Sequence, residues 1–351
     1  MVSLDQQGTA EILRRLRDVA PSNGAWSHAD KERLLYPLTQ ALLGCPLAQR
    51  RAVLRQLCGD NGQGHYPAIT FHSTDGRPVP IFLPPDTFDP IDPWSWLFRA
   101  GLASLDMRGK TICEVGTGSG AAAIELLQSD ALPERLVLID IDAHVLDVAR
   151  LNIETTCQPR IFDRGIGVTY TVGDAADVFQ QMAAAGARLH FDHIFGCIPQ
   201  VPADPQCLPA GQHVAHEYDE RRHQRFHDWG LGLLYDVHRA ALPLLSSNGS
   251  MVFVHSGRVP AAVRGEFHRQ LGLSVVNTLV DQMIPHCPST SLRYLFGHDQ
   301  EELLFADIDG TRPISSELAE ELRSQAYADD PHCIDCGVYH RVFVLETARN
   351  N

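Results

Sequence analysis

The sequence has no apolar run that approaches the length needed to cross a bilayer, which is about 20 consecutive residues in a helix. Residues 1–20 contain Arg14, Arg15 and Arg17 within an amphipathic pattern and have no uninterrupted apolar core, so they do not resemble a signal peptide. With 351 residues, the chain is long enough for one large domain with additions or for two domains. We therefore expect a cytoplasmic protein without a membrane partner.

Positive charge is also scarce. The chain has 29 Lys and Arg against 43 Asp and Glu, which gives a formal net charge of −14. Its basic patches, at 14–17 and 221–225, are short and mixed with acids. A chain this acidic repels a phosphate backbone unless it carries a local basic stripe. Nucleic acid is therefore not an expected partner.

A second cysteine pair with the spacing of a zinc site is missing. The nine cysteines are an odd number and are spread through predicted strands and helices, which is typical of reduced thiols. Cys333 and Cys336, flanked by His332 and His340, offer zinc-like ligands, but only as one pair. We expect no required metal, and the sequence leaves open whether this pair binds one.

The segment 111–120 has the pattern of a strand, a tight turn and the start of a helix. An apolar stretch ends in Glu114 and Val115, and glycines follow at every second position: Gly116, Gly118 and Gly120. Glycine allows the backbone to turn sharply and a ligand to approach the main chain closely. The first N–H groups of the following helix lack partners within the helix. The segment therefore predicts a cofactor-binding turn.

The spacing of this turn excludes two common nucleotide sites. A P-loop needs a lysine after its last glycine, and none follows Gly120. A dinucleotide site places its last glycine three positions on, and Glu114 would repel a pyrophosphate lying in the turn. The carboxylate favours a cationic or hydroxyl-rich ligand instead. A glycine-rich turn without a ligand remains the alternative.

Further strands followed by acids extend this pattern. Leu136 to Asp140 has the composition of a buried strand, and an acid at its end can accept hydrogen bonds from ribose hydroxyls. Residues 166–172 form a third expected strand followed by Asp174, and residues 191–197 form a fourth. Strands that alternate with helices predict a Rossmann-like α/β sheet with helices on both faces and the ligand at its carboxyl edge.

These motifs together resemble the class I S-adenosylmethionine (SAM) methyltransferases. The resemblance implies SAM as the methyl donor, and in the family the acid after the third strand lies near the adenine amino group, which assigns that place to Asp174. The cofactor residues that it implies are Glu114, Gly116, Thr117, Gly118, Gly120, Asp140, Ile141, Asp174, Ala175 and Cys197.

The chain is expected to divide into three parts. Residues 1–75 have the pattern of an N-terminal helical region, 76–310 of the methyltransferase domain, and 311–351 of a C-terminal helix and strand. Six prolines between Pro78 and Pro93 predict extended or turning backbone rather than a long helix.

The end of the fourth strand bears on the methyl acceptor. In amide and nucleobase N-methyltransferases this place reads Asn/Asp-Pro-Pro-Tyr/Phe and holds an NH2 group. Here it reads Cys197, Ile198, Pro199 and Gln200, so the amide acceptor, one proline and the aromatic residue are gone. A site that lacks these groups favours a thioether acceptor, which has no N–H group to bind. A divergent nitrogen methyltransferase is the alternative.

The run 196–201 is similar to the methyltransferase domain of methionine S-methyltransferases, in their free-standing bacterial form. Segments 81–84, 228–234 and 251–258 fit in the same order, so the resemblance covers roughly 65–310. It implies methylation of methionine to S-methylmethionine, which in some bacteria starts a route to dimethylsulfoniopropionate. No catalytic base is expected, because the attacking sulfur is neutral. The expected substrate residues are Pro199, Gln200, Tyr218, Asp219 and Arg258, whose guanidinium suits a carboxylate.

Two other functions stay open. One is an N- or O-methyltransferase acting on a small metabolite or a protein glutamine. The other is a SAM-binding subunit without activity of its own. The sequence also leaves open whether the chain forms a homodimer.

Overall fold

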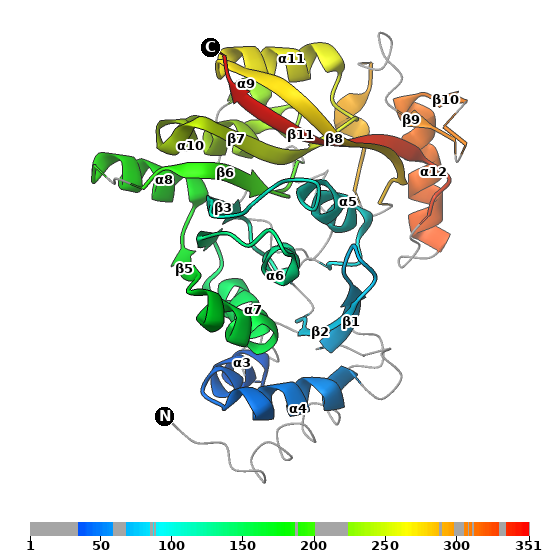
Figure 1. The fold of residues 1–351 in the computed structure, drawn as a ribbon. Helices are drawn as coiled ribbons and strands as arrows, with labels where there is room; N and C mark the ends of the chain where they lie inside the picture. Colours follow the sequence, from blue (N-terminus) through cyan, green and yellow to red (C-terminus); the bar gives the residue numbers. More distant parts are fainter. Residues whose placement is uncertain are drawn as a thin grey trace. The chain divides into compact units, whose positions relative to one another are not determined.

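The computed structural model describes residues 34–58, 68–84, 87, 89–186, 189–200, 224–287, 290–297, 305–307, 309–310, 312–329 and 335–350. These residues form an α/β fold of the Rossmann-like kind, with two compact units that meet in the chain between Asp174 and Ala175 (Figure 1). None of the helices in the described ranges is both long and apolar enough to span a membrane. The domain limits after residues 75 and 310 remain a prediction.

Three parallel strands form the sheet of the first unit: β3 (Thr111–Val115), β4 (Arg135–Asp140) and β5 (Gly167–Val172). β4 pairs with β3 on one side and with β5 on the other. Residues 136–139 are fully buried, as expected for an apolar strand covered on both faces. The strands predicted at 111–115, 136–140 and 166–172 are thereby confirmed.

Two helices connect these strands and pack against each other, α6 (Ala121–Gln128) and α7 (Ala143–Arg164). α6 follows Gly120 directly. α7 begins after Asp142, whose side chain accepts hydrogen bonds from the backbone N–H groups of His144 and Val145. This is the usual N-cap, which satisfies N–H groups that have no partner within the helix. The alternation of strand and helix predicted from the sequence is therefore present.

The helices α3 (Tyr36–Leu43) and α4 (Leu47–Cys58) pack against α7. Their buried leucines and valine form a core with Phe82, Val148 and Leu151. Burial of each such side chain contributes about 2 kcal/mol. Both helices lie within the N-terminal region that was predicted to be helical.

The strands β1 (Ala68–His72) and β2 (Pro78–Phe82) form an antiparallel hairpin. The prediction of a helical region up to residue 75 is therefore wrong over β1. Its residues Ile69, Thr70 and Phe71 are β-branched or aromatic, which favours an extended pleated chain. Prolines are tolerated in β2 because, in a two-stranded sheet, both strands are edges.

The proline-rich segment ends in a helix, α5 (Pro93–Leu102), where the sequence predicted no long helix. Pro93 is the first helical residue, a position at which its missing N–H costs nothing. The Asp92 carboxylate accepts a hydrogen bond from the backbone N–H of Trp94 at 2.8 Å and caps the helix. The prolines therefore restrict the backbone before residue 93 but start the helix at 93.

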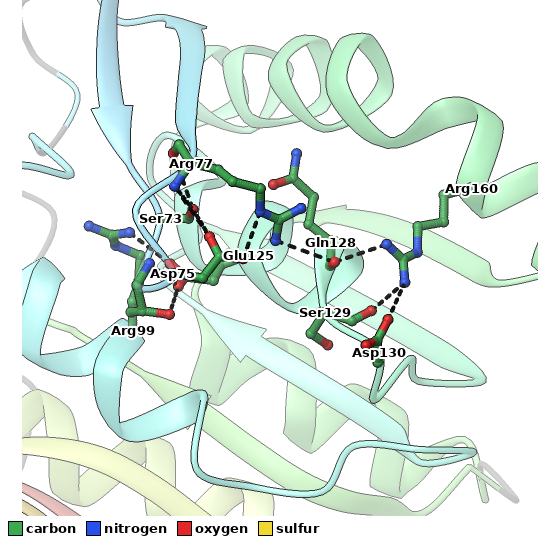
Figure 2. A network of polar contacts seen from close by, with 10 residues as sticks. Ser73, Asp75, Arg77, Arg99, Glu125, Gln128, Ser129, Asp130 and Arg160 are labelled. Atoms are coloured by element: carbon green, nitrogen blue, oxygen red, sulfur yellow. Dashed lines mark hydrogen bonds and ion pairs between the residues drawn. The ribbon is translucent and has the colours of Figure 1, made fainter.

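A network of polar side chains connects the hairpin of β1 and β2 to α6 (Figure 2). Glu125 lies on α6 and accepts hydrogen bonds from the backbone N–H of Thr74 at 2.6 Å and from the Thr74 hydroxyl. Its other carboxylate oxygen lies 2.7 Å from Nη1 of Arg99 on α5, and both side chains are buried. At the end of α6, Arg77 and Arg160 donate to the carbonyl of Gln128. These contacts fix the helix that follows the glycine turn.

The second unit has a mixed sheet. β6 (Phe191–Gly196) runs parallel to β7 (Leu245–Ser256), and β11 (Tyr339–Arg349) lies antiparallel between β7 and β8 (Leu273–Pro285) (Figure 1). Two short strands, β9 (Phe305–Ala306) and β10 (Pro313–Ile314), pair beyond β11. The fourth strand predicted at 191–197 and the strand predicted within 311–351 are confirmed.

The helices of the second unit include α12 (Ser316–Asp329), which confirms the helix predicted within 311–351. The others are α8 (Ala175–Ala184), α9 (Gln224–His227), α10 (Gly232–Ala241) and α11 (Ala261–Gln270), with short 3₁₀ turns at η3 (Leu242–Leu244) and η4 (Arg293–Leu295). α10 packs against α8, and α11 packs against β8.

Candidate functional site

The turn between β3 and α6 has the tight geometry that its glycines predict. Gly116, Gly118 and Gly120 all have positive φ, at 67°, 55° and 79°. A Cβ on Gly120 would also lie 3.2 Å from the backbone of Ala149 and from Cδ1 of Ile153 on α7. Gly120 is therefore required both by its backbone conformation and by the close approach of α7.

The end of β4 supports this turn through hydrogen bonds. The N–H of Gly116 donates to the carbonyl of Ile139 at 2.9 Å, and the Thr117 hydroxyl donates to the same carbonyl at 3.3 Å. The N–H of Gly118 donates to Oδ2 of Asp140 at 3.0 Å. Oδ1 of Asp140 accepts the N–H of Asp142 at 3.1 Å. The first unit thus brings the predicted residues from 116 to 118 and Asp140 together.

Glu114, the penultimate residue of β3, is buried with only 2% of its surface exposed. Its Oε2 has no hydrogen-bond partner among the described residues. Burial raises the pKa of Glu114 well above its usual value, and the nearby charge of Asp140 raises it further. A buried carboxyl oxygen without a partner is costly, so this position suits a ligand that brings positive charge or hydrogen-bond donors.

Asp140 is also buried, and burial raises its pKa despite the backbone N–H groups of Gly118 and Asp142 that favour its charged form. Two acceptor bonds leave lone pairs of the carboxylate available, because an ionised carboxylate offers about four acceptor positions. SAM offers hydrogen-bond donors in its ribose hydroxyls and its ammonium group, and it carries a second positive charge on its sulfonium. Glu114 and Asp140 together fit such a group, and neither is recorded in an ion pair within the described residues.

Asn152 on α7 supports the glycine turn through hydrogen bonds, and no pattern in the sequence predicted this role. It is fully buried, and its Oδ1 accepts the N–H of Phe82 at 2.8 Å. Its Nδ2 donates to the carbonyls of Phe82 at 2.8 Å and of Ser119 at 3.0 Å. One amide therefore connects the end of β2 with the glycine turn.

Four further predicted cofactor residues lie shortly after the ends of strands, in the expected order. Ile141 follows β4 and is 39% exposed. Asp174 follows β5, and it is half-buried. Ala175, the first residue of α8, belongs to the second unit, as does Cys197, which is half-buried directly after β6. Their roles at a cofactor remain predictions.

Gln200 is buried, and its amide is bonded to the backbone of β7. Its Nε2 donates to the carbonyl of Val254 at 2.6 Å, and its Oε1 accepts the N–H of Ser256 at 2.9 Å. The side-chain amide thus pairs with the backbone of β7 as a neighbouring strand would, and it holds the segment 197–200 at the end of β7. Pro199 beside it is exposed. Contact of either residue with a substrate remains a prediction, and for Gln200 the structure adds a role in holding this segment.

Arg258, just after β7, is buried with 5% of its surface exposed. Its backbone N–H and its Nε donate to the hydroxyl of Ser256 at 3.2 and 2.9 Å. Burial lowers the pKa of the imidazoles of His286 and His340. The nearby charge of Arg258 is the second cause, and it lowers the pKa of both further. The pKa of His286 is about 3, so this histidine is neutral at ordinary pH. A buried guanidinium beside neutral imidazoles is suited to a carboxylate.

Other predicted residues lie outside the described ranges, namely Tyr218, Asp219, His332 and Cys333. Cys336 is described and buried, and its thiol donates to the carbonyl of His286 at 3.5 Å. In the described part of the chain, no group of three or more His, Cys, Asp and Glu is arranged to hold a metal ion.

No protein-family model and no curated protein matches the sequence. Several solved structures are similar at low identity. Precorrin 8w decarboxylase from Methanobacterium thermoautotrophicum is 15% identical, with a TM-score of 0.38 over 76% of this chain and 96% of its own. Ribosomal protein L11 methylase from Lactobacillus delbrueckii subsp. bulgaricus is 15% identical, with a TM-score of 0.37 over 56% and 76% of the two chains.

A third similar structure is precorrin-6y C5,15-methyltransferase from Geobacter metallireducens GS-15. It is 12% identical, with a TM-score of 0.35 over 72% of this chain and 85% of its own. Two of these three proteins are methyltransferases by name. Similarities of this strength carry no argument about what this chain binds.

Proposed function

We propose that the protein is a SAM-dependent methyltransferase and that its acceptor is the thioether sulfur of methionine, which it converts to S-methylmethionine. The observation that carries the SAM part is the buried pair of Glu114 and Asp140 at the glycine turn. One carboxyl oxygen of this pair lacks a partner, and no cation is recorded beside it in the described residues. A ligand with two cationic groups and a ribose diol supplies what the pair lacks.

The glycine turn adds the shape that such a ligand needs. Three positive-φ glycines bring the main chain close to the carboxyl ends of β3 and β4 without side chains in the way. The turn is held by Asp140 from one side and by Asn152 from the other. Its residues are therefore fixed before a ligand binds, which lowers the entropy cost of binding.

The case for a sulfur acceptor rests on the segment after β6. The side chains there include a thiol at Cys197 and an amide at Gln200 whose oxygen and one N–H already serve β7. A target NH2 group would need free acceptors at this place, whereas a thioether needs none. We assign Arg258 to the carboxylate of methionine, because its guanidinium is a buried donor of suitable geometry.

The proposed reaction is a direct displacement. A lone pair of the methionine sulfur forms a bond to the methyl carbon as the bond from that carbon to the sulfonium of SAM breaks, and S-adenosylhomocysteine leaves with the electron pair. The attacking sulfur is neutral and carries no proton, so no base is needed. Catalysis then comes mainly from holding the two sulfur atoms in line, and positioning of this kind can lower a barrier by about 7–11 kcal/mol.

This proposal is tested by incubating the protein with SAM labelled in its methyl group and with single amino acids, followed by mass spectrometry of the products. Label in methionine is the expected result. Label in an amine, amide or hydroxyl acceptor, with none in methionine, would replace the thioether by a nitrogen or oxygen acceptor. Binding of SAM without transfer to any acceptor would instead indicate a SAM-binding subunit.

A further inference from the structure

Two acidic side chains lie buried next to each other in the first unit without a recorded counter-charge. Glu114 and Asp140 are exposed over only 2% and 8% of their surface. Glu114 is the penultimate residue of β3, and Asp140 is the last residue of the neighbouring parallel strand β4. The backbone N–H groups of Gly118, Asp142 and Ile141 stabilise the negative charge of Asp140, whereas Oε2 of Glu114 has no hydrogen-bond partner among the described residues. If only one of the two is ionised, the contacts favour Asp140.

We propose that Glu114 carries a proton when the site is empty and releases it as SAM binds, so that this residue selects for a positively charged nucleoside. The inference rests on the proposed binding of SAM and adds a mechanism of selection to it. In this step the O–H bond of Glu114 breaks, and the proton goes to the buffer. The carboxylate that remains is neutralised by the positive charge that SAM brings, and no electron is transferred.

The physical reason is the cost of burying two like charges. Desolvation penalises an ionised carboxylate strongly, and a second carboxylate nearby raises the penalty. The pKa of Glu114 is raised by both causes, burial being the larger. SAM carries an ammonium, a sulfonium and one carboxylate, so it brings a net positive charge. This positive charge stabilises the carboxylate of Glu114, so the ionised form is favoured over the protonated form.

The other titratable groups around this pair do not offer an alternative source of the proton. Cys113 precedes Glu114, and burial together with the charge of Glu114 raises the pKa of its thiol well above the usual value. The Cys113 thiol therefore keeps its proton. Asp142 lies beyond Asp140, where its carboxylate caps α7 and accepts two backbone N–H groups. Among the described residues of the first unit, Glu114 is the one acid here with an unpartnered buried oxygen.

Isothermal titration calorimetry in buffers of different ionisation enthalpy measures the proton directly. For SAM we expect release of about one proton per molecule bound, and an affinity that strengthens by up to about tenfold per pH unit as pH rises. The neutral nucleoside 5′-methylthioadenosine should bind without releasing a proton. No release with SAM, or equal release with both ligands, overturns the proposal.

The matched variants are Glu114→Gln and Asp142→Asn. Glutamine keeps the size of Glu114 but has no proton to release, so SAM should bind more weakly and with no proton exchange. Asn at position 142 removes an acid near the pair and still caps α7, so proton release should stay as in the wild type. Undiminished release in Glu114→Gln overturns the assignment to this residue.

Infrared spectroscopy of the wild-type protein provides a second measurement in case Glu114→Gln does not fold. The C=O band of a protonated carboxyl should be present without ligand and should be lost when SAM is added. Persistence of the band with SAM bound overturns the proposal. If SAM binds and is used for methyl transfer without proton exchange, only this inference fails. If SAM does not bind at all, the proposed function fails with it.

Discussion

The side-chain amide of Asn152 pairs with both backbone polar groups of Phe82, accepting its N–H and donating to its carbonyl, each at 2.8 Å. The same amide also donates to the carbonyl of Ser119 in the glycine turn. The end of β2 is thereby joined to the turn through one fully buried residue of α7. This arrangement gives a first test of whether the turn is the SAM site.

Asn152→Asp should weaken SAM binding by about tenfold or more, because a carboxylate would face two carbonyls whose lost hydrogen bonds each cost about 1–3 kcal/mol. The KM of the methyl acceptor should change much less. The matched control is Thr155→Val on the same helix, which removes the hydroxyl bonded to the carbonyl of Leu151 at 2.6 Å without touching the turn. Equal effects of both variants on SAM affinity would show that Asn152 acts only through stability.

Gly120→Ala should lower both stability and SAM affinity. Its φ of 79° is unfavourable for alanine, and the new Cβ would lie 3.2 Å from the backbone of Ala149. We expect a loss of about 1–3 kcal/mol in the free energy of unfolding, measured in urea. Gly165→Ala is the control, since Gly165 also has positive φ, at 64°, but its Cβ would meet nothing within 4 Å. A loss no larger than that of the control would contradict the close packing of α7 on the turn.

Arg99→Met should destabilise the first unit strongly. Arg99 pairs with Glu125 at 2.7 Å, and both side chains are buried. Removing one partner leaves a buried charge uncompensated, which typically costs about 3–5 kcal/mol. The exposed pair of Arg108 and Asp106 has a similar separation of 2.8 Å, and Arg108→Met should change the free energy of unfolding far less than Arg99→Met does. Urea denaturation compares the two, and similar losses would contradict the account.

The second unit should lose stability as the pH falls below the pKa of an ordinary histidine. His238, His255 and His268 are buried around Phe267, with ring centroids 5.4, 5.8 and 5.2 Å from its ring. Burial lowers the pKa of His238 to about 3 and of His268 to about 4, and that of His255 well below its usual value. The charge of Arg264 on α11 further lowers the pKa values of His255 and His268.

The sign follows from the proton balance. Below the unfolded pKa of 6.5 these histidines bind protons in the unfolded chain but stay neutral in the fold. The free energy of unfolding should therefore be constant above that pH and fall between 6.5 and about 4. His268→Leu should reduce this slope, and the exposed control His190→Asn should not. A slope that is unchanged in His268→Leu would contradict the assignment.

The sequence was sufficient for the parallel strands and the glycine turn, because these depend on local patterns. Runs such as Leu136 to Ile139 are apolar throughout, and alternate glycines can only mark a special turn. It was not sufficient for the partners of Asn152 and Gln200. Asn152 bonds residue 82, which is 70 positions away, and Gln200 bonds β7, which is 54 and 56 positions away. An asparagine in a helix or a glutamine after a strand carries no local sign of such a partner.

The proline-rich segment that contains β2 and the start of α5 shows a second limit of prediction from the sequence. The prolines from Pro78 to Pro93 predicted extended or turning backbone, which agrees with Pro78 and Pro80 in the edge strand β2, whereas Pro93 begins the helix α5. In both cases the missing N–H has no partner to lose. Composition alone did not distinguish a proline that breaks an element from one that begins it.

The central claim is tested most directly by one turnover with SAM carrying a ¹³C-labelled methyl group and unlabelled methionine, followed by NMR of the product. The account predicts that the label is found in the dimethylsulfonium group of S-methylmethionine and that the yield follows the amount of SAM bound. Label on the amino nitrogen or the carboxylate of the acceptor, or no label in methionine while another acceptor takes it, would contradict the account.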